Sequence, residues 1–262
     1  MSRSRWLLGL LCGLVCVYLL APIFVVVGAS FNAGAFLTFP PRGLSLRWFA
    51  AFLGNPVFID AIVRSLWLAL AATAVSGVIG VAAALYYVRH AARGKEVIRL
   101  AILLPLLLPE VLTAMALLFF FYALGIGTRF GIGMVVGHIL ITLPFVFLNV
   151  VTALHGFDAN WDLAARSLGA GRWTRFRRIT LPLIKPGVIN GCLFAFIISF
   201  DTFGISYLLK DVGGATLPLQ LFDYLRFNFT PEAAAVSTMS IVMALVVVVA
   251  TEKLVGLKIE RF

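Results

Sequence analysis

Hydrophobic residues occur in six long runs along the chain, and polar residues are concentrated between them. The runs cover residues 6–29, 65–88, 100–121, 132–154, 188–209 and 233–250. None alternates with the period of two that marks a membrane-spanning strand, and each is close to the roughly 20 apolar residues that a helix needs to cross a bilayer. Lipid offers backbone groups no hydrogen-bond partner, so helices are favoured. The pattern predicts an all-α membrane protein with six transmembrane helices, forming a single domain over residues 1–262.

The composition supports this prediction. Hydrophobic residues make up 62% of the chain and charged residues only 12%, whereas a soluble domain has about 25% charged residues. The first run is longer than the hydrophobic region of a signal peptide, about 7–15 residues, so we expect it to be retained as a membrane span. Cys12, Cys16 and Cys192 lie within or beside apolar runs without metal-ligand spacing, so we expect no metal site.

The distribution of lysine and arginine predicts the orientation. If the N-terminus is cytoplasmic, 15 of the 21 basic residues fall on the cytoplasmic side of the membrane. Because cytoplasmic loops of membrane proteins carry an excess of these residues, we expect both termini in the cytoplasm. The same rule accounts for the sequence pI of about 10.1, and we expect no nucleic-acid partner.

A long cytoplasmic segment, residues 158–182, separates the fourth and fifth runs and contains five arginines. Residues 161–168 have helical spacing, and Gly169 follows at the position of a left-handed residue that ends a helix. Residues 172–179 fit a second short helical piece. Two short helices that meet at a glycine predict a compact knob on the membrane surface. Its apolar side chains and arginines suit insertion into a groove of a partner protein.

The spacing of small and apolar residues in this segment resembles the EAA loop of permeases of binding-protein-dependent ABC transporters, the type I importers. The matching positions are Ala164, Ala165, Gly169, Ile179, Leu181 and Pro182. In that family the loop is a coupling helix that docks on the ATP-binding subunit. The resemblance implies that the first three positions contact that subunit and that the last three anchor the knob to the membrane helices. Leu163 stands where the family usually has a glutamate, and Asp162, one position earlier, is placed to substitute for it in part. Both residues are therefore counted among the positions predicted to contact the ATP-binding subunit.

Shorter motifs resemble one branch of this family, which includes spermidine/putrescine, opine and phosphonate permeases. Examples are Pro109-Glu110 and Ser199-Phe200-Asp201. The resemblance implies a type I importer permease fold in the bacterial inner membrane. It also implies four partners: two ATP-binding cassette subunits, which bind the ATP, a second and different permease subunit, and an external solute-binding protein.

Ionisable residues inside the runs are candidates for a solute pathway, because such groups are costly in a membrane and are often functional. At 1.5 Å per residue, Glu110 lies about 15 Å from the cytoplasmic end of its run, Asp201 about 20 Å from the cytoplasmic end of its own, and His138 about 9 Å from the outer end. The predicted pathway residues are Glu110, His138, Asp201, Thr202, Phe203 and Tyr207. Two alternatives stand beside this prediction. Glu110 also fits the cap of a broken helix, and His138 fits a hydrogen-bonded core residue.

The predicted pathway suits an amine-bearing solute, because carboxylates attract amines and aromatic rings bind cations. The resemblance implies two acidic residues at the motif that ends here in Asp201-Thr202. The threonine in the second place favours a singly charged or zwitterionic solute over a polyvalent cation.

Motifs for enzyme activity are missing from the sequence. It contains no G-x-x-x-x-G-K-[ST] phosphate loop and no evident arrangement of nucleophile, histidine and acid, so we expect neither an ATPase site, nor catalytic residues, nor a cofactor bound by this chain. The prediction is a permease subunit driven by its partners. The alternative is a stand-alone ion-coupled secondary transporter, for which six spans give a thin pathway and the arginine-rich knob has no use.

Overall fold

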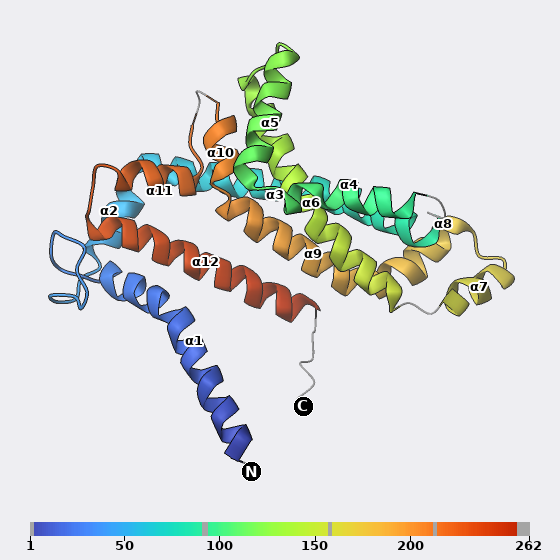
Figure 1. Ribbon diagram of the computed structural model, residues 1–262, viewed down its shortest axis with the longest axis horizontal. Coiled ribbons are helices and arrows are strands. Elements are labelled where there is room, and N and C mark those ends of the chain that lie inside the picture. Colours follow the sequence, from blue (N-terminus) through green and yellow to red (C-terminus); the bar gives the residue numbers. More distant parts are fainter. Residues whose placement is uncertain (1–2, 91–93, 157–158, 212–213, 256–262) are drawn as a thin grey trace. The chain divides into compact units, whose positions relative to one another are not determined.

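The computed structural model describes residues 3–90, 94–156, 159–211 and 214–255, which are predominantly helical (Figure 1). In chain order the elements are α1 (Arg3–Ser30), α2 (Arg47–Gly54), α3 (Pro56–Arg89), α4 (Lys95–Leu107), α5 (Glu110–Ala123), η1 (Arg129–Gly131), α6 (Ile132–His155), α7 (Ala159–Ser167), α8 (Arg172–Arg175), the π-helical turn η2 (Phe176–Thr180), α9 (Leu181–Asp201), α10 (Gly204–Leu209), α11 (Leu217–Leu225) and α12 (Pro231–Val255). The described residues contain no β-strand, only an isolated bridge between Asn32 and Leu44. The all-α prediction is confirmed.

Several of these helices are long and apolar enough to cross a membrane. Within the described residues they are Trp6–Ser30, Pro56–Arg89, Ile132–His155, Arg172–Asp201 and Pro231–Lys253. The pair α4 and α5 adds a sixth if both helices belong to one span, and the pair is bent by 106°. The result agrees with the predicted number of spans. The structure differs from the predicted runs in two places, where a run is interrupted.

The first interruption divides the third run at Leu108-Pro109. Leu108 has an extended backbone with ψ of 146°, and Pro109 follows with ψ of 132°. Proline clashes with an α-helical conformation of the residue before it, which explains the extended backbone and the end of α4. Hydrophobicity continues across the break, so the length of the run does not reveal it. The alternative that Glu110 lies at a broken helix did anticipate it, and the structure places Glu110 at the first residue of α5.

The second interruption divides the fifth run. α9 ends at Asp201, Thr202 has an extended backbone with ψ of 122°, and α10 resumes at Gly204. The helix also begins earlier than expected, because α8, η2 and α9 form one continuous helical span from Arg172 to Asp201. The predicted second helical piece of the knob, residues 172–179, is therefore the first part of this span and not a separate helix.

The chain divides into two compact units, and each is described by itself. The first comprises residues 1–59 and 220–245. Asn32 organises the loop after α1, because its buried amide nitrogen donates to the carbonyl of Phe36 and to Thr38, and its amide oxygen accepts from Gly34 and Arg42. The second unit comprises residues 60–219 and 246–262 and holds both interruptions.

The core of the second unit is the pair α6 and α9, which lie side by side in Figure 1. Small residues allow this close packing. A Cβ at Gly187 would lie 2.6 Å from the Cβ of Ala153, and a Cβ at Gly191 would lie 2.8 Å from the Cα of Val146. Such small residues at a spacing of four are typical of helices that pack closely within a membrane.

Candidate functional site

The two interrupted hydrophobic runs meet in the second unit through Glu110. This residue begins α5, directly after the first break, and its Oε1 accepts a hydrogen bond from the backbone N–H of Ile205 at 2.9 Å. Ile205 lies in the first turn of α10, where N–H groups have no partner within the helix. The glycine at position 204 leaves room for this contact, because a Cβ there would lie 3.0 Å from the Cδ of Glu110 and the carboxylate would have to shift. The carboxylate thus joins one break to the other.

We call this region the break junction. It consists of Glu110, His138, Ser199, Asp201, Thr202, Phe203, Gly204, Ile205, Ser206 and Tyr207. It contains all the residues predicted for the solute pathway, and it brings together α5, α6, α9 and α10 in one unit.

His138 braces the break between α9 and α10. The side chain is fully buried, with Nδ1 2.8 Å from the Oγ of Ser199 on α9 and Nε2 3.1 Å from the Oγ of Ser206 on α10. Both ring nitrogens therefore have hydroxyl partners, one on each side of the break. This geometry favours the alternative of a hydrogen-bonded core residue, and contact between His138 and a solute stays a prediction.

Asp201 is the accessible carboxylate of the junction. It is the last residue of α9, it is exposed, and it lies within electrostatic range of Glu110. Phe203 and Tyr207 follow Asp201 in the sequence, and their rings stack on each other with centroids 5.4 Å apart. Tyr207 is 46% exposed. Carboxylates next to accessible aromatic rings are suited to bind an amine.

Thr202 plays a different part from these neighbours. It is only 6% exposed, and its hydroxyl donates at 2.6 Å to the carbonyl of Ile198, four residues earlier. The side chain therefore completes the end of α9, where carbonyl groups lack partners within the helix. Its place in a solute pathway stays a prediction.

The knob begins with α7, which ends in a Schellman motif around Gly169. Gly169 has a φ of +79°, its N–H donates to the carbonyl of Arg166 at 3.0 Å, and the N–H of Ala170 donates to the carbonyl of Ala165 at 3.0 Å. These bonds satisfy carbonyls that the end of a helix leaves without partners. The predicted left-handed glycine is confirmed. Residue 158, where the predicted loop begins, lies outside the described residues.

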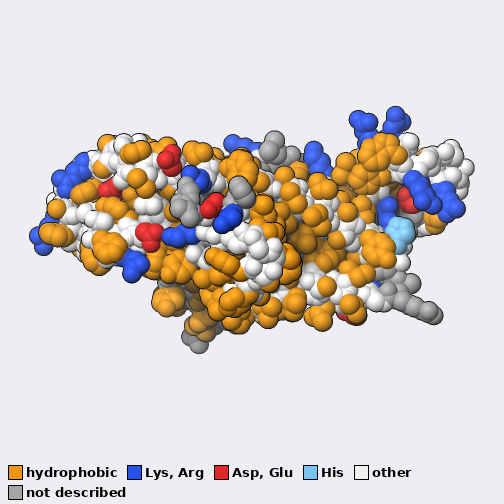
Figure 2. Space-filling view, turned by 90° about the horizontal axis from the view of Figure 1, so that it is seen from above, with side chains coloured by type: hydrophobic (Ala, Val, Ile, Leu, Met, Phe, Trp, Pro, Cys, Tyr) orange, Lys and Arg blue, Asp and Glu red, His pale blue; other side chains and the backbone are white. Residues whose placement is uncertain are grey.

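The surface of the knob is apolar and basic. The large apolar side chains are between 56% and 88% exposed: Trp161, Leu163, Leu168 and Trp173. The exposed arginines are Arg166, Arg172, Arg177 and Arg178. Ala164 is exposed as well, and Ala165 is half-buried. Figure 2 shows Lys and Arg side chains next to hydrophobic ones at the end of the second unit that carries α7 and α8.

Asp162 and Arg175 form an ion pair inside the knob, with 2.7 Å between Oδ2 and Nη1. Asp162 lies in the first turn of α7, where the helix dipole favours a negative charge, and Arg175 ends α8. The pair therefore ties the two helices together across the Gly169 turn. Asp162 was predicted to contact the partner, and that contact stays a prediction.

The knob is attached to the rest of the unit at η2. Thr180 is buried there, and its hydroxyl accepts a hydrogen bond at 2.8 Å from Arg89 at the end of α3. Ile184 is buried one turn further along α9. Of the predicted anchors, Ile179 is half-buried, whereas Leu181 and Pro182 are exposed in this chain.

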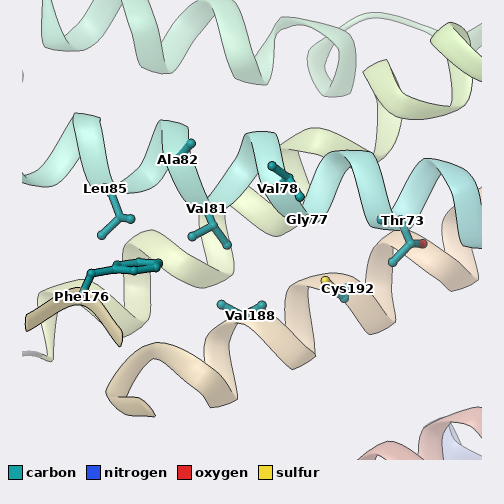
Figure 3. A pocket seen from close by; sticks show the side chains of 10 residues that line it. Thr73, Gly77, Val78, Val81, Ala82, Leu85, Phe176, Val188 and Cys192 are labelled. Atoms are coloured by element: carbon teal, nitrogen blue, oxygen red, sulfur yellow. The ribbon is translucent and has the colours of Figure 1, made fainter. Parts of the chain in front are cut away.

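An apolar cavity of about 490 Å³ lies between α3 and α9 in the second unit. Figure 3 shows side chains from both helices pointing into it, among them Val81 and Val188, with Phe176 of η2 at one end. The lining has no ionisable side chain apart from the thiol of Cys192, so the cavity does not suit a charged amine. Its apolar lining contrasts with the carboxylates and hydroxyls of the break junction. Within the described residues, no three His, Cys, Asp or Glu side chains gather to hold a metal ion.

Sequence reasoning missed several partners in these sites. Arg175 was counted only as one of five loop arginines, although an acid and an arginine on either side of a turn glycine are a usable signal for an ion pair. Ser206 and Arg89 carried no signal of their own, because serine is common in membrane helices and a single arginine at the cytoplasmic end of a span is expected from topology. Their roles depend on contacts between residues more than 60 positions apart.

Comparison with known sequences places these features in context. Residues 76–254 match the family described as binding-protein-dependent transport system inner membrane component. The spermidine/putrescine transport system permease protein PotC of Haemophilus influenzae is 32% identical over 91% of this chain and 92% of its own length. The putrescine transport system permease protein PotI of Escherichia coli strain K12 is 33% identical over 90% of this chain and 86% of its own.

Solved structures agree with the fold. One is a bacterial alginate ABC transporter in complex with a periplasmic protein bound to an alginate pentasaccharide. It superposes with a TM-score of 0.74 over 96% of this chain and 94% of that chain, at 18% identity. The MetNI methionine ABC transporter in inward-facing conformations gives a TM-score of 0.60 over 76% of this chain and 96% of that chain, at 20% identity.

Proposed function

Because the chain belongs to the binding-protein-dependent transport system inner membrane component family, and is thus a multi-pass permease subunit of the inner membrane, we propose that ATP hydrolysed by partner subunits drives its transport cycle through the knob. Two ATP-binding cassette subunits bind the ATP. A second, different permease subunit completes the pathway, and an external solute-binding protein delivers the solute. The N- and C-termini lie in the cytoplasm, on the side of the ATP-binding subunits.

The observation that carries this proposal is the continuous helical span from Arg172 to Asp201. Its first residues belong to the knob and its last residue belongs to the break junction. Thirty residues correspond to about 45 Å at 1.5 Å per residue, which exceeds the thickness of the hydrocarbon core. A displacement of the knob by a partner therefore moves a continuous helical element that ends at the break junction.

The break junction is the proposed site of the solute. Breaks in membrane helices place backbone polar groups and carboxylates in the middle of a membrane, and transport sites commonly use them. Asp201 and Glu110 attract a positive charge, and Phe203 and Tyr207 offer aromatic faces. The resemblance to permeases named for putrescine and spermidine supports an amine. With Thr202 in place of a second acid, the solute is a small amine-bearing or zwitterionic molecule.

Coupling is tested by substitution of Gly169 in the assembled transporter in proteoliposomes. Valine at this position disfavours the left-handed backbone, because a β-branched side chain at positive φ is strained. A Cβ there meets no other atom within 4 Å, so the effect is one of backbone conformation alone. We expect Gly169→Val to abolish ATPase stimulation by the binding protein and to leave membrane insertion intact.

The matched control is Gly171→Val. Gly171 also has open space around its Cβ position, but its φ is −64°, which valine accepts. This variant should keep its stimulation. If Gly169→Val is stimulated as strongly as the wild type, the knob does not couple ATP hydrolysis to transport.

The solute site is tested by uptake of a radiolabelled diamine. Asp201→Asn keeps the shape of the side chain and removes its charge, so we expect weaker uptake at low diamine concentration. The control is Glu96→Gln, which removes a highly exposed carboxylate from α4, 3.8 Å from Arg99. Wild-type uptake by Asp201→Asn, at equal protein levels, would remove Asp201 from the pathway.

A further inference from the structure

Asp162 is directed into the knob and not toward its outer surface. Its carboxylate accepts from Arg175 at 2.7 Å, and the two side chains are only 29% and 16% exposed, in the order Asp162 and Arg175. The Nε of Arg175 is buried as well. Arg175 therefore differs from the other four arginines of the knob, which are exposed.

The acidic residue of this knob is at position 162, one residue before the position of the glutamate in the loop it resembles, and this difference decides which side chain the partner meets. Successive residues of an α-helix point about 100° apart, so neighbours face different surroundings. On α7, Asp162 faces α8 through its ion pair, whereas Leu163 is 57% exposed. Leu163 occupies the position that carries a glutamate in the loop it resembles. At that point the surface of this knob is apolar, where a glutamate would make it negative.

The described part of the knob, residues 159–182, therefore has one sign of charge on its outer surface. Asp162 is the only carboxylate of residues 160–182, and it is paired internally. Four arginines are exposed in this part of the chain, together with two tryptophan and two leucine side chains. Tryptophan and arginine are the residue types that most often supply binding energy in protein interfaces. Complementary charge across such an interface fixes orientation and excludes wrong partners.

We propose that this knob fits an ATP-binding subunit whose groove has an apolar floor and an acidic rim, and that Asp162 is a positioning residue that holds α7 against α8. This rests on the proposed function, in which the knob docks on such a subunit. It assigns no partner contact to Asp162. The apolar floor of the groove receives Leu163 and Leu168, and its acidic rim meets the exposed arginines.

The test is a charge exchange in the complete transporter, read as ATPase stimulation by the binding protein. Asp162→Arg and Arg175→Glu alone each place two like charges together, and each should lower stimulation by about fivefold, the scale of a partly exposed ion pair. The double variant restores opposite charges, so it should recover most of the stimulation. The matched control is Asp162→Arg combined with Arg178→Glu. It should show no recovery, because Arg178 is exposed and is not the ion-pair partner of Asp162.

A double variant no better than Asp162→Arg would overturn the positioning role, because a carboxylate that binds the partner is not restored by a change at Arg175. The acidic rim is tested separately by the salt dependence of subunit association. Arg172→Glu with Arg177→Glu should weaken association and flatten its dependence on salt, since fewer charge pairs are screened. Unchanged salt dependence would refute the acidic rim.

One further variant separates this inference from the proposed function. Leu168→Asp places a charge on the most exposed apolar side chain of the knob, at 88% exposure. Suppose that Leu168→Asp abolishes stimulation, and that Asp162→Arg with Arg175→Glu recovers no more stimulation than Asp162→Arg alone. The knob then docks on its partner, and only the inference about Asp162 is wrong. If neither Leu168→Asp nor Gly169→Val changes stimulation, the proposed function is wrong as well.

Discussion

Glu110 has a structural contact and a proposed transport role in the break junction, and two substitutions distinguish them. Its Oε1 accepts the N–H of Ile205 at 2.9 Å, which is a structural role, and its negative charge faces the region of Asp201, which is the proposed transport role. Glu110→Gln keeps an oxygen acceptor at the same place and removes the charge. Glu110→Ala removes both the acceptor and the charge.

The size of the structural effect follows from the hydrogen bond. Ile205 is fully buried, so loss of its acceptor leaves a backbone N–H without a partner in an environment poor in water. A bond to a charged acceptor contributes about 1.5–3 kcal/mol, and an unsatisfied buried donor costs about 1–3 kcal/mol. We expect Glu110→Ala to lose about 2 kcal/mol of stability. Glu110→Gln retains a neutral hydrogen bond and should lose about 1 kcal/mol or less.

Two measurements on the purified complex separate the roles. The midpoint of thermal unfolding should fall by about 4–8 °C for Glu110→Ala and by much less for Glu110→Gln, at about 2–4 °C per kcal/mol. Uptake of a radiolabelled diamine at low concentration should fall for both variants, because both lack the charge. Equal midpoints for the two variants would refute the role of the hydrogen bond. Normal uptake by Glu110→Gln would refute the role of the charge.

Two further predictions concern packing and bracing in the second unit. Gly191→Ala places a Cβ 2.8 Å from the Cα of Val146 and should destabilise the protein by about 1–3 kcal/mol. The control Gly13→Ala, where nothing lies within 4 Å of the new Cβ, should be neutral or slightly stabilising. Equal thermal midpoints for the two variants would argue against close packing of α6 on α9. His138→Leu removes the partner of the buried Ser199 hydroxyl and one of the two partners of the buried Ser206 hydroxyl, so it should destabilise the protein by about 1–3 kcal/mol. His155→Leu, at an exposed position, should unfold like the wild type. A His138→Leu protein as stable as this control would rule out the brace.

The membrane helices were predictable because the length of a hydrophobic run can be read from a single stretch of sequence, without knowing which other segments it contacts. The runs at 132–154 and 233–250 became α6 and α12 with small changes at their ends. The third and fifth runs failed as single helices for different reasons. Leu108-Pro109 carried a local signal, since proline restricts the residue before it, and that signal was outweighed by continuous hydrophobicity. The break after Asp201 has no proline, and the hydrogen bonds that connect it to other helices come from Glu110 and His138.

The knob was more predictable than the break junction. The left-handed conformation of Gly169 depends on a few neighbouring residues, and the sequence contains all of them. Asp162 and Arg175 are thirteen positions apart, and their pairing depends on the turn at Gly169 between them. Contacts such as those of His138 join residues 61 and 68 positions apart, and nothing local encodes which serine lies opposite. The types of residue at the junction could be predicted, but their partners could not.

Thr202 shows what this difference means for solute choice. The resemblance implies an acidic residue here, and the sequence alone suggests that Thr202→Asp would create a site for a polyvalent amine. The structure indicates a different result. Position 202 is 6% exposed, and the hydroxyl of Thr202 donates to the carbonyl of Ile198, an acceptor that a carboxylate would repel. An ionised aspartate would lose this bond and have to leave its buried position, so we expect Thr202→Asp to lower the thermal midpoint without a gain in uptake of a labelled triamine. Thr202→Ser keeps the hydroxyl and should behave like the wild type in both assays. Increased triamine uptake by a Thr202→Asp protein of normal stability would show that the end of α9 can rearrange, and that position 202 belongs to the solute site in spite of its burial.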